Sequence, residues 1–565
     1  MAPRPLEWWK RAVFYQIYPR SYQDSNGNGI GDLPGITARL DHLAGGDNSL
    51  GVDAIWISPF YPSPMKDFGY DVSDYTDVDP RFGTLADFDA LLGEAHARGL
   101  RVIIDLVINH TSDEHPWFAD ARRSRSAPRH DWYLWYPDRR PNNWVSIFEL
   151  RSAWWHNRPT DEYYYGSFTR HQPEVNWRNP ELRRAMFDVM RFWLDRGVDG
   201  FRLDAVNSYI KDDKLRSNPY TLRPIPGFFQ RHIYDINQPE TIDICREMRA
   251  VTDEYDNRMM IGEVFVDNID LAASFHGPNA DALHLASNFN FLYQPWSARN
   301  FAAAARAWYG PLPPEAWPNF VLSNHDQPRH YSRYARGAET DARARVAAAM
   351  LLTLKGTPFL YYGEEIGMHN VRIPRGRLQD PLGRRTWPLR FGRDPERTPM
   401  QWDDSPTAGF TAGTPWLRLA DDYRSVNVAA QRDDPDSLFS FYRRLLQLRH
   451  EKEALHSGEI DFLVEGEGGC LAYKRVAVGG SASGERAASG PAASEPPAGP
   501  EPSGYAVVVL NFRNRAVRAR ADWPRGRVLL GTERAPGELV APGSSGRLEL
   551  APYEVVIYES EHPGA

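Results

Sequence analysis

The chain has 565 residues, of which 42% are hydrophobic and 25% charged, close to the averages of folded globular proteins. At roughly 100 to 200 residues per domain, this length predicts two to four domains, and the composition excludes wholesale disorder. The 74 acidic residues outnumber the 66 Lys and Arg residues, and the formal net charge is -8. That balance argues against nucleic acid or an anionic membrane as the main partner and favours a small or uncharged substrate.

The cysteine content and the amino terminus indicate the compartment. Cys245 and Cys470 are too few for a disulfide framework, and neither lies in a CxxC pattern. The first residues, MAPRPLEWWKRAVFYQIYPRSY, contain no apolar signal-peptide core, and the chain has no uncharged apolar run of about 18 residues. We therefore expect a cytoplasmic protein without a membrane partner.

Short apolar runs rich in strand-forming residues alternate with segments of helical periodicity. The runs lie at 13–18, 53–58, 101–107, 200–203, 259–261, 319–322 and 357–361. Between them, 84–98 and 180–196 carry apolar residues at helical spacing behind plausible N-cap residues. No GxGxxG follows the first strand. The alternation therefore predicts an α/β fold, a (β/α)8 TIM barrel, rather than an open doubly wound sheet.

Two insertions interrupt this alternation. Residues 110–176, after the third strand, are rich in Trp, Tyr, Pro and Arg and have little periodicity, so we expect an inserted domain there. Residues 207–240, after the fourth strand, form a second insertion that would overhang the same barrel face. The barrel would then comprise residues 1–109 and 177–455.

Beyond the barrel, the pattern changes to alternating strands. The segments 504–511 and 554–559 have strand character, so residues 456–565 are expected to form a C-terminal antiparallel β-sandwich domain. Within it, residues 479–504 are a low-complexity Gly, Ala, Ser and Pro sequence that cannot bury enough apolar surface to order itself. We expect a mobile surface loop there.

Three acidic residues follow predicted strands. Asp204 ends GFRLD, Glu263 ends MMIGE and Asp326 follows VLSNH. In a barrel the carboxyl ends of the strands open into one shared funnel. One acid in such a position is more often part of a structural ion pair, but three at like positions indicate a common site. Paired carboxylates are what glycosidic cleavage requires, one as nucleophile and one as proton donor.

The neighbours of these acids suggest different roles. Arg202 lies two residues before Asp204 on the same strand and would hold it ionised, as a nucleophile requires. Glu263 follows Met259, Met260 and Ile261 with no adjacent base, a setting that raises a carboxyl pKa and suits a general acid.

Several segments of the chain, including those around the three acids, resemble the α-amylase family of glycoside hydrolases, and within it the oligosaccharide α-glucosidases. The resemblance runs from Phe14 to about Leu448 and rests on DLVINH, GFRLDAVN, IGEVF, LSNHDQPR and GTPFLYYGEEIGM. It implies a retaining mechanism with Asp204 as nucleophile, Glu263 as acid/base and Asp326 as a third acid that binds sugar hydroxyls. The first two carboxyl groups should then lie about 5 to 5.5 Å apart.

The same resemblance implies a set of substrate-binding residues. Asp71 in GYDVSDY and Arg397 in ERTPMQWD match the pair that clamps the non-reducing end of the sugar, which makes such enzymes exo-acting. His110, His325 and Arg202 match further substrate-binding residues of the family.

One segment departs from the family pattern. The element that reads QPDLN in the family is Gln172-Pro173-Glu174-Val175-Asn176 here, and the longer Glu174 side chain has to be accommodated locally.

Residues 24–32, DSNGNGIGD, place oxygen ligands at the spacing of a calcium loop. A structural Ca²⁺ or Mg²⁺ is expected, although a glycine-rich turn closed by side-chain hydrogen bonds would fit the same letters. The family resemblance favours a metal, held by Asp24, Asn26, Asn28, Ile30 and Asp32.

Several functions fit these residues. We expect a retaining, exo-acting α-glucosidase that releases terminal glucose from short oligosaccharides or disaccharides. An α-1,4 linkage is expected because Ala205 follows the nucleophile, where α-1,6-selective relatives have Val. The alternatives are a transglucosylase, a sucrose or maltose isomerase, or an α-1,6-preferring glucosidase. A non-catalytic binding subunit is disfavoured, since all three acids are present. No organic cofactor is expected, and the protein should be a monomer or a homodimer.

Overall fold

The computed structural model describes residues 6–138, 140–221, 230–266, 268–389, 391–477, 505–543 and 546–560. Its centre is a sheet of eight parallel strands in the order β10-β11-β1-β2-β3-β7-β8-β9. The two end strands, β9 and β10, lie next to each other, so the sheet forms a nearly closed barrel. The strands are β1 (Phe14–Ile17), β2 (Ala54–Ile57), β3 (Arg101–Leu106), β7 (Gly200–Leu203), β8 (Met259–Val264), β9 (Leu285–Asn288), β10 (Asn319–Val321) and β11 (Thr357–Tyr361).

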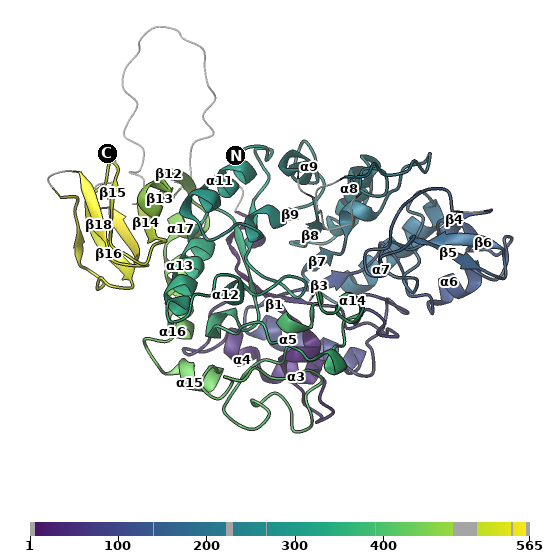
Figure 1. Cartoon of the computed structure of the whole chain (residues 1–565), viewed down its shortest axis with the longest axis horizontal. Coiled ribbons are helices and arrows are strands. Elements are labelled where there is room, and N and C mark those ends of the chain that lie inside the picture. The colour runs from purple at the N-terminus through teal and green to yellow at the C-terminus, as the bar shows by residue number, and fades with distance from the viewer. Residues whose placement is uncertain are drawn as a thin grey trace, which may run out of the picture.

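Helices cover the outside of the barrel (Figure 1). The long ones are α5 (Leu85–Ala97), α7 (Pro180–Asp195), α8 (Glu240–Thr252), α11 (Ala298–Tyr309), α13 (Thr340–Thr353) and α16 (Leu438–Glu451). Local sequence sets their starts: Thr84 and Asp87 form a reciprocal capping box at α5, and Asn179 caps α7 by accepting two backbone N–H bonds. The short helices are α1 (Trp8–Arg11), α2 (Pro19–Tyr22), α3 (Leu33–Ala38), α4 (Leu40–Leu43), α6 (Pro116–Ala121), α9 (Ile269–Ser274), α10 (Phe289–Leu292), α12 (His330–Arg333), α14 (Pro381–Thr386), α15 (Val428–Arg432) and α17 (Glu453–His456).

The predicted barrel is confirmed, with one strand added. All seven predicted runs contain a strand, and the two predicted helices are α5 and α7. The strand missed in the sequence is β9, whose letters are LASN. It contains no β-branched or aromatic residue, so its strand conformation comes from parallel pairing with β8.

The insertion after β3 carries its own small antiparallel sheet. It consists of β4 (Trp135–Tyr136), β5 (Trp154–Asn157) and β6 (Glu162–Tyr165), in the order β4-β6-β5. Buried Trp144, Trp154 and Tyr165 form its core. The second insertion packs against this sheet, since Asn143 donates to the carbonyl of Asn218 at 2.9 Å. Both insertions therefore project from the same part of the barrel (Figure 1).

The C-terminal domain is antiparallel. Its main sheet has the order β12-β13-β14-β19-β16-β17, and β15 pairs with β18 beside it. The strands predicted at 504–511 and 554–559 are β14 and β19, and the expected loop at 479–504 lies outside the described residues. The strands are β12 (Glu459–Glu465), β13 (Cys470–Val476), β14 (Tyr505–Asn511), β15 (Val517–Arg520), β16 (Gly526–Gly531), β17 (Leu539–Val540), β18 (Arg547–Leu550) and β19 (Val555–Ser560).

Buried Arg475 ties this domain to the barrel, and buried Arg449 supports the same junction from the barrel side. Arg475, on β13, donates to the carbonyls of Thr353 and Leu455 at 2.5 and 2.9 Å. Arg449, on α16, donates to the carbonyl of Leu455 at 2.8 Å and to that of Gly356 at 2.9 Å. These guanidiniums therefore satisfy carbonyls at the ends of barrel elements.

Across the described ranges, the structure contains no helix with both the length and the apolar character needed to cross a membrane. Cys245 and Cys470 are both buried as free thiols.

Candidate active site

The three acids singled out in the sequence lie at the carboxyl-terminal ends of barrel strands. Asp204 follows β7 directly, Glu263 lies near the end of β8, and Asp326 lies just beyond β10. Leu203 of β7 is opposite Gly262 of β8, so Asp204 and Glu263 leave adjacent strands at the same level. Their side chains are 10%, 16% and 27% exposed, in chain order. The site is thus buried but open to solvent.

One guanidinium connects two of these acids. Arg202 Nη1 lies 2.6 Å from Asp204 Oδ1, and Nη2 lies 2.8 Å from Glu263 Oε2. The same Nη1 also donates to Asp105 Oδ1 at 2.9 Å. A planar fork of this kind matches carboxylate geometry, so Asp204 and Glu263 are held close together by a common partner.

Burial opposes the charge of Arg202 at both acids. It raises the pKa of Asp204 to about 7 and the pKa of Glu263 to about 7, although Arg202 lowers both. The contact between Arg202 and Asp204 is present as expected, but the pKa of Asp204 is raised in spite of it. The expected absence of a base beside Glu263 is wrong, because Arg202 approaches it from the neighbouring strand.

Asp326 lies in a different electrostatic environment. Arg397 Nη2 contacts its Oδ1 at 2.5 Å, Arg393 Nη1 lies 3.4 Å from the same oxygen, and His325 Nε2 lies 3.3 Å from Oδ2. Burial would raise the pKa of Asp326, but His325, Arg397 and Arg393 outweigh it and lower the pKa well below its usual range. Asp326 is therefore a permanent anion at neutral pH.

Both predicted histidines are buried and hydrogen-bonded. His325 Nδ1 lies 2.7 Å from Gln16 Nε2, an amide nitrogen that can only donate, and His325 Nε2 lies 2.6 Å from the hydroxyl of Tyr70. His110 Nε2 lies 2.8 Å from the carbonyl of Tyr70 and 3.1 Å from Gln172 Nε2. Burial lowers the pKa of each imidazole.

The structure gives Asp71 a different place from the one expected. Its carboxylate is fully buried and accepts hydrogen bonds from Ser63 Oγ, Lys66 N and Asp67 N at 2.9, 2.8 and 3.0 Å. Asp67 instead points at Arg393, with an ion-pair distance of 2.5 Å. Asp71 therefore holds a loop, and Asp67 occupies the position beside the arginines.

Asp67 and Arg393 were missed in the sequence. Asp67 lies four residues before Asp71, and Arg393 lies four residues before Arg397, the two residues that the sequence analysis selected. The amino-acid sequence alone does not show which of the two aspartates, or which of the two arginines, faces the site. A second missed group is Tyr70, whose hydroxyl donates to Asp105 Oδ2 at 3.0 Å.

The unusual Glu174 finds a partner within the fold. Lys211 Nζ, from the second insertion, lies 2.6 Å from its Oε2, and Ser167 N donates to Oε1 at 2.9 Å. The longer side chain is thus satisfied without contact to the three acids.

The predicted metal loop, residues 24–32, has oxygen donors of the kind that hard cations take. Asp24 and Asp32 are 4% and 1% exposed, and within the described part of the chain neither forms an ion pair. Burial raises the pKa of Asp32, and the charge of Asp24 adds to that shift. No group of three or more His, Cys, Asp or Glu side chains among the described residues could hold a metal, so a cation here would also need amide and main-chain oxygens.

The comparisons with known proteins identify the family. Residues 16–458 match the family model of the alpha amylase catalytic domain. A probable alpha-glucosidase of Rhizobium meliloti is 47% identical over 485 residues, which are 83% of this chain and 87% of that protein. An oligo-1,6-glucosidase of Parageobacillus thermoglucosidasius is 40% identical over 504 residues, 83% of this chain and 88% of that protein.

Solved structures show the same likeness over the whole chain. XgtA, described as an alpha-glucosyl transfer enzyme, matches with a TM-score of 0.88 at 38% identity and covers 99% of this chain and 100% of its own. The trehalulose synthase MutB of Pseudomonas mesoacidophila matches with a TM-score of 0.84 at 32% identity and the same coverage.

Proposed function

The chain belongs to the alpha-amylase family and is a glycoside hydrolase, and from that premise we propose that it is a retaining, exo-acting α-glucosidase. Its substrates would be short oligosaccharides or disaccharides with a terminal α-1,4-linked glucose. The observation that carries the proposal is the Arg202 guanidinium, which contacts Asp204 and Glu263 at once. Retaining enzymes need their two carboxyl groups close together, whereas inverting enzymes need room for a water molecule between them.

In the first step, Asp204 attacks the anomeric carbon and the glycosidic bond breaks. Glu263 gives its proton to the leaving oxygen, for which the raised pKa prepares it. In the second step, ionised Glu263 takes a proton from water, and the resulting hydroxide equivalent cleaves the glucosyl ester of Asp204. The anionic Asp326 would accept hydroxyl donors of the sugar and stabilise the positive charge that develops on the ring.

Contacts between the inserted domain and the residues near Asp326 support the proposed exo preference. Arg393 pairs with Asp67, and its guanidinium lies 4.4 Å from the centre of the Phe148 ring of the inserted domain. Nearby, Arg385 donates to the carbonyl of Glu149 at 2.7 Å. These contacts join the insertion to α14 and to the loop that follows it. We propose that Asp67 and Arg393 bind the terminal hydroxyls of the sugar there, in place of the expected Asp71.

We also propose that residues 24–32 bind a structural Ca²⁺ or Mg²⁺. Asp24, Asn26, Asn28, Asp32 and the main-chain oxygen of Ile30 would hold it, and the cation would neutralise two buried carboxylates. It would take no part in the chemistry.

A leaving-group comparison tests the assigned roles. Replacing Glu263 by Gln should reduce kcat/KM on maltose by about 100- to 10,000-fold, but far less on a nitrophenyl α-glucoside, whose leaving group needs no proton. Replacing Asp204 by Asn should abolish both activities. Equal losses on both substrates in Glu263→Gln would contradict Glu263 as the general acid, and full activity of Asp204→Asn would overturn the proposal.

Glucosyl transfer is the second candidate, favoured by the likeness to XgtA and to the trehalulose synthase. Product analysis at high maltose concentration separates the two: hydrolysis yields glucose alone, while transfer yields new disaccharides or longer sugars. Rates on maltose, isomaltose, sucrose and trehalose determine the linkage preference, which the relatives named α-glucosidase and oligo-1,6-glucosidase leave open.

A further inference from the structure

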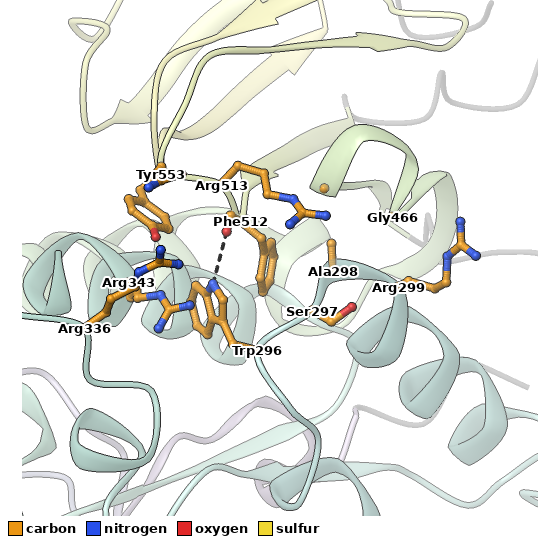
Figure 2. A pocket seen from close by; sticks show the side chains of 12 residues that line it. Trp296, Ser297, Ala298, Arg299, Arg336, Arg343, Gly466, Phe512, Arg513 and Tyr553 are labelled. Atoms are coloured by element: carbon orange, nitrogen blue, oxygen red, sulfur yellow. Dashed lines mark hydrogen bonds between the residues drawn. The ribbon is translucent and has the colours of Figure 1, made fainter.

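A cavity of about 260 Å³ lies between the barrel and the C-terminal domain (Figure 2). The barrel side contributes Trp296, Arg299 and Arg343, and the C-terminal domain contributes Phe512 and Arg513. Its described lining residues include none of those in the candidate active site. The cavity is thus a separate feature that exists only because the two domains meet.

Its lining is strongly basic. Arg299, Arg336, Arg343 and Arg513 all line it, and among the described residues that do so none is acidic. Arg336 forms an ion pair with Glu339 at 3.3 Å. In the part of the chain that the structure describes, the other three guanidiniums form no ion pair, although the chain as a whole carries a net charge of -8. One carboxylate lies close by, because Glu339 also accepts hydrogen bonds from the lining residues Tyr553 and Asn514. The four guanidiniums outnumber it, so the cavity has a net positive potential that attracts anions.

Arg343 is held in place before any ligand arrives. Its Nη1 donates to the carbonyl of Tyr334 at 2.6 Å, and its guanidinium lies 4.7 Å from the centre of the Trp296 ring. Trp296 is itself fixed by donating to the carbonyl of Phe512 at 3.1 Å, the dashed line in Figure 2.

Two glycines in the turn between β12 and β13 leave space for Arg513 and Arg299. At Gly469, which has a φ of 91°, a Cβ atom would lie 2.4 Å from Arg513 Nε. At Gly466, with a φ of 109°, a Cβ atom would lie 2.5 Å from Arg299 Cβ. Both backbone conformations favour glycine, so the turn lets Arg513 and Arg299 lie against it at the rim of the cavity.

The size and the donors together define the ligand class. The cavity is slightly smaller than the roughly 300 to 1,000 Å³ of most small-molecule sites. Its charged donors are the arginine side chains, since Ser297, the N-cap of α11, already accepts the N–H of Asn300. Guanidiniums that arrive from both domains suit a tetrahedral oxyanion with acceptors on every side better than a planar carboxylate. We propose that this cavity binds a phosphate group, either as inorganic phosphate or as the phosphate ester of a small sugar.

Calorimetric titration of the full chain tests the proposal, with inorganic phosphate and glucose 6-phosphate as separate ligands at constant ionic strength. The wild-type protein should bind one equivalent. Arg513→Gln and Arg299→Gln should each raise Kd about tenfold or more, because each removes a charged donor. Both side chains are exposed and form no hydrogen bond or ion pair within the described residues, so these variants should fold normally, which circular dichroism checks.

The matched control is Arg518→Gln, which removes an exposed arginine from β15 of the same domain and should leave Kd unchanged. A Kd for glucose 6-phosphate that is about tenfold lower than for phosphate would identify a phosphate ester as the ligand, and equal values would identify phosphate itself. Absence of saturable binding, or equal Kd values in wild type and both cavity variants, would overturn the proposal. Because the assay measures binding alone, its outcome is independent of the glucosidase activity.

Discussion

At the scale of single residues, Arg202 serves two carboxyl groups with opposite tasks. Catalysis requires Asp204 to be ionised while Glu263 is protonated, yet burial raises the pKa of both to about 7. Groups that interact this closely release their protons as a pair rather than independently. The singly protonated form of the pair, which is the active one, is therefore most populated near neutral pH.

This pairing predicts a bell-shaped dependence of kcat/KM on pH for maltose. When the pH is lowered from about 7, kcat/KM should decrease because Asp204 gains a proton. When the pH is raised from about 7, kcat/KM should decrease because Glu263 loses its proton. The alkaline limb should disappear in Glu263→Gln, because Gln carries no titrating proton. A profile that stays flat through neutrality would show that another step limits the rate.

Asp71→Asn tests whether Asp71 acts through Asp67. The Asp71 carboxylate accepts two backbone N–H bonds from a loop in which Met65 and Phe68 have φ values of 60° and 51°. The two bonds go to different carboxylate oxygens, and Asn keeps only one acceptor oxygen, so one of the two bonds is lost. The strained loop should then relax and Asp67 should leave Arg393. We expect kcat/KM to fall by up to about 100-fold, the effect of a small misplacement.

The control for this variant is a double-mutant cycle. If Asp71 only positions Asp67, Asp71→Asn should add little to the loss already caused by Asp67→Asn. Losses that add independently would instead support the direct sugar contact expected from the sequence.

At the scale of elements, the sequence was informative where local chemistry decides structure. The strand that ends at Leu203 and the helix that begins after Thr84 were predictable from apolar runs and capping residues. Strand β9 was not, because a run of Leu, Ala, Ser and Asn becomes a strand only beside β8. Asp67 and Asp71 could not be distinguished for the same reason. Tertiary packing decides which of the two carboxylates faces Arg393, and the local sequence does not determine that packing.

Removal of the metal is a prediction about one element, the loop from Asp24 to Asp32. Chelator treatment should lower the unfolding temperature, and added Ca²⁺ should restore it, since a ligand at a hundredfold excess over Kd stabilises by about 2.7 kcal/mol. Asp24→Ala should be less stable and should no longer respond to the chelator. The control is Asp404→Asn at an exposed position, and an equal response in Asp24→Ala would contradict the site.

At the scale of the whole molecule, the two domains are joined through buried polar groups rather than through apolar contact alone. Arg475 donates to three carbonyls, those of Thr353, Leu455 and Gly458, while burial lowers its pKa to about 10. A cation in such a place is tolerated because both terminal nitrogens of its guanidinium donate to carbonyls, although its Nε has no partner.

Arg475→Met should therefore destabilise the joined domains by at least about 3 kcal/mol, because buried carbonyls lose their donors. The check is the urea midpoint together with hydrogen exchange at β13. Arg518→Met, which changes an exposed arginine of β15, should shift stability by no more than about 0.5 kcal/mol. Equal midpoints for the two variants would show that the interface does not depend on Arg475.

The order of the barrel strands also has a consequence for how the protein is made. Strand β1 pairs with β2 on one side and with β11 on the other, and β11 leaves the ribosome only after more than half of the chain has been synthesised. At about 5 to 20 residues per second, one edge of β1 waits tens of seconds for its partner. We expect molecular chaperones to shield that open edge during translation, since an unpaired strand invites aggregation.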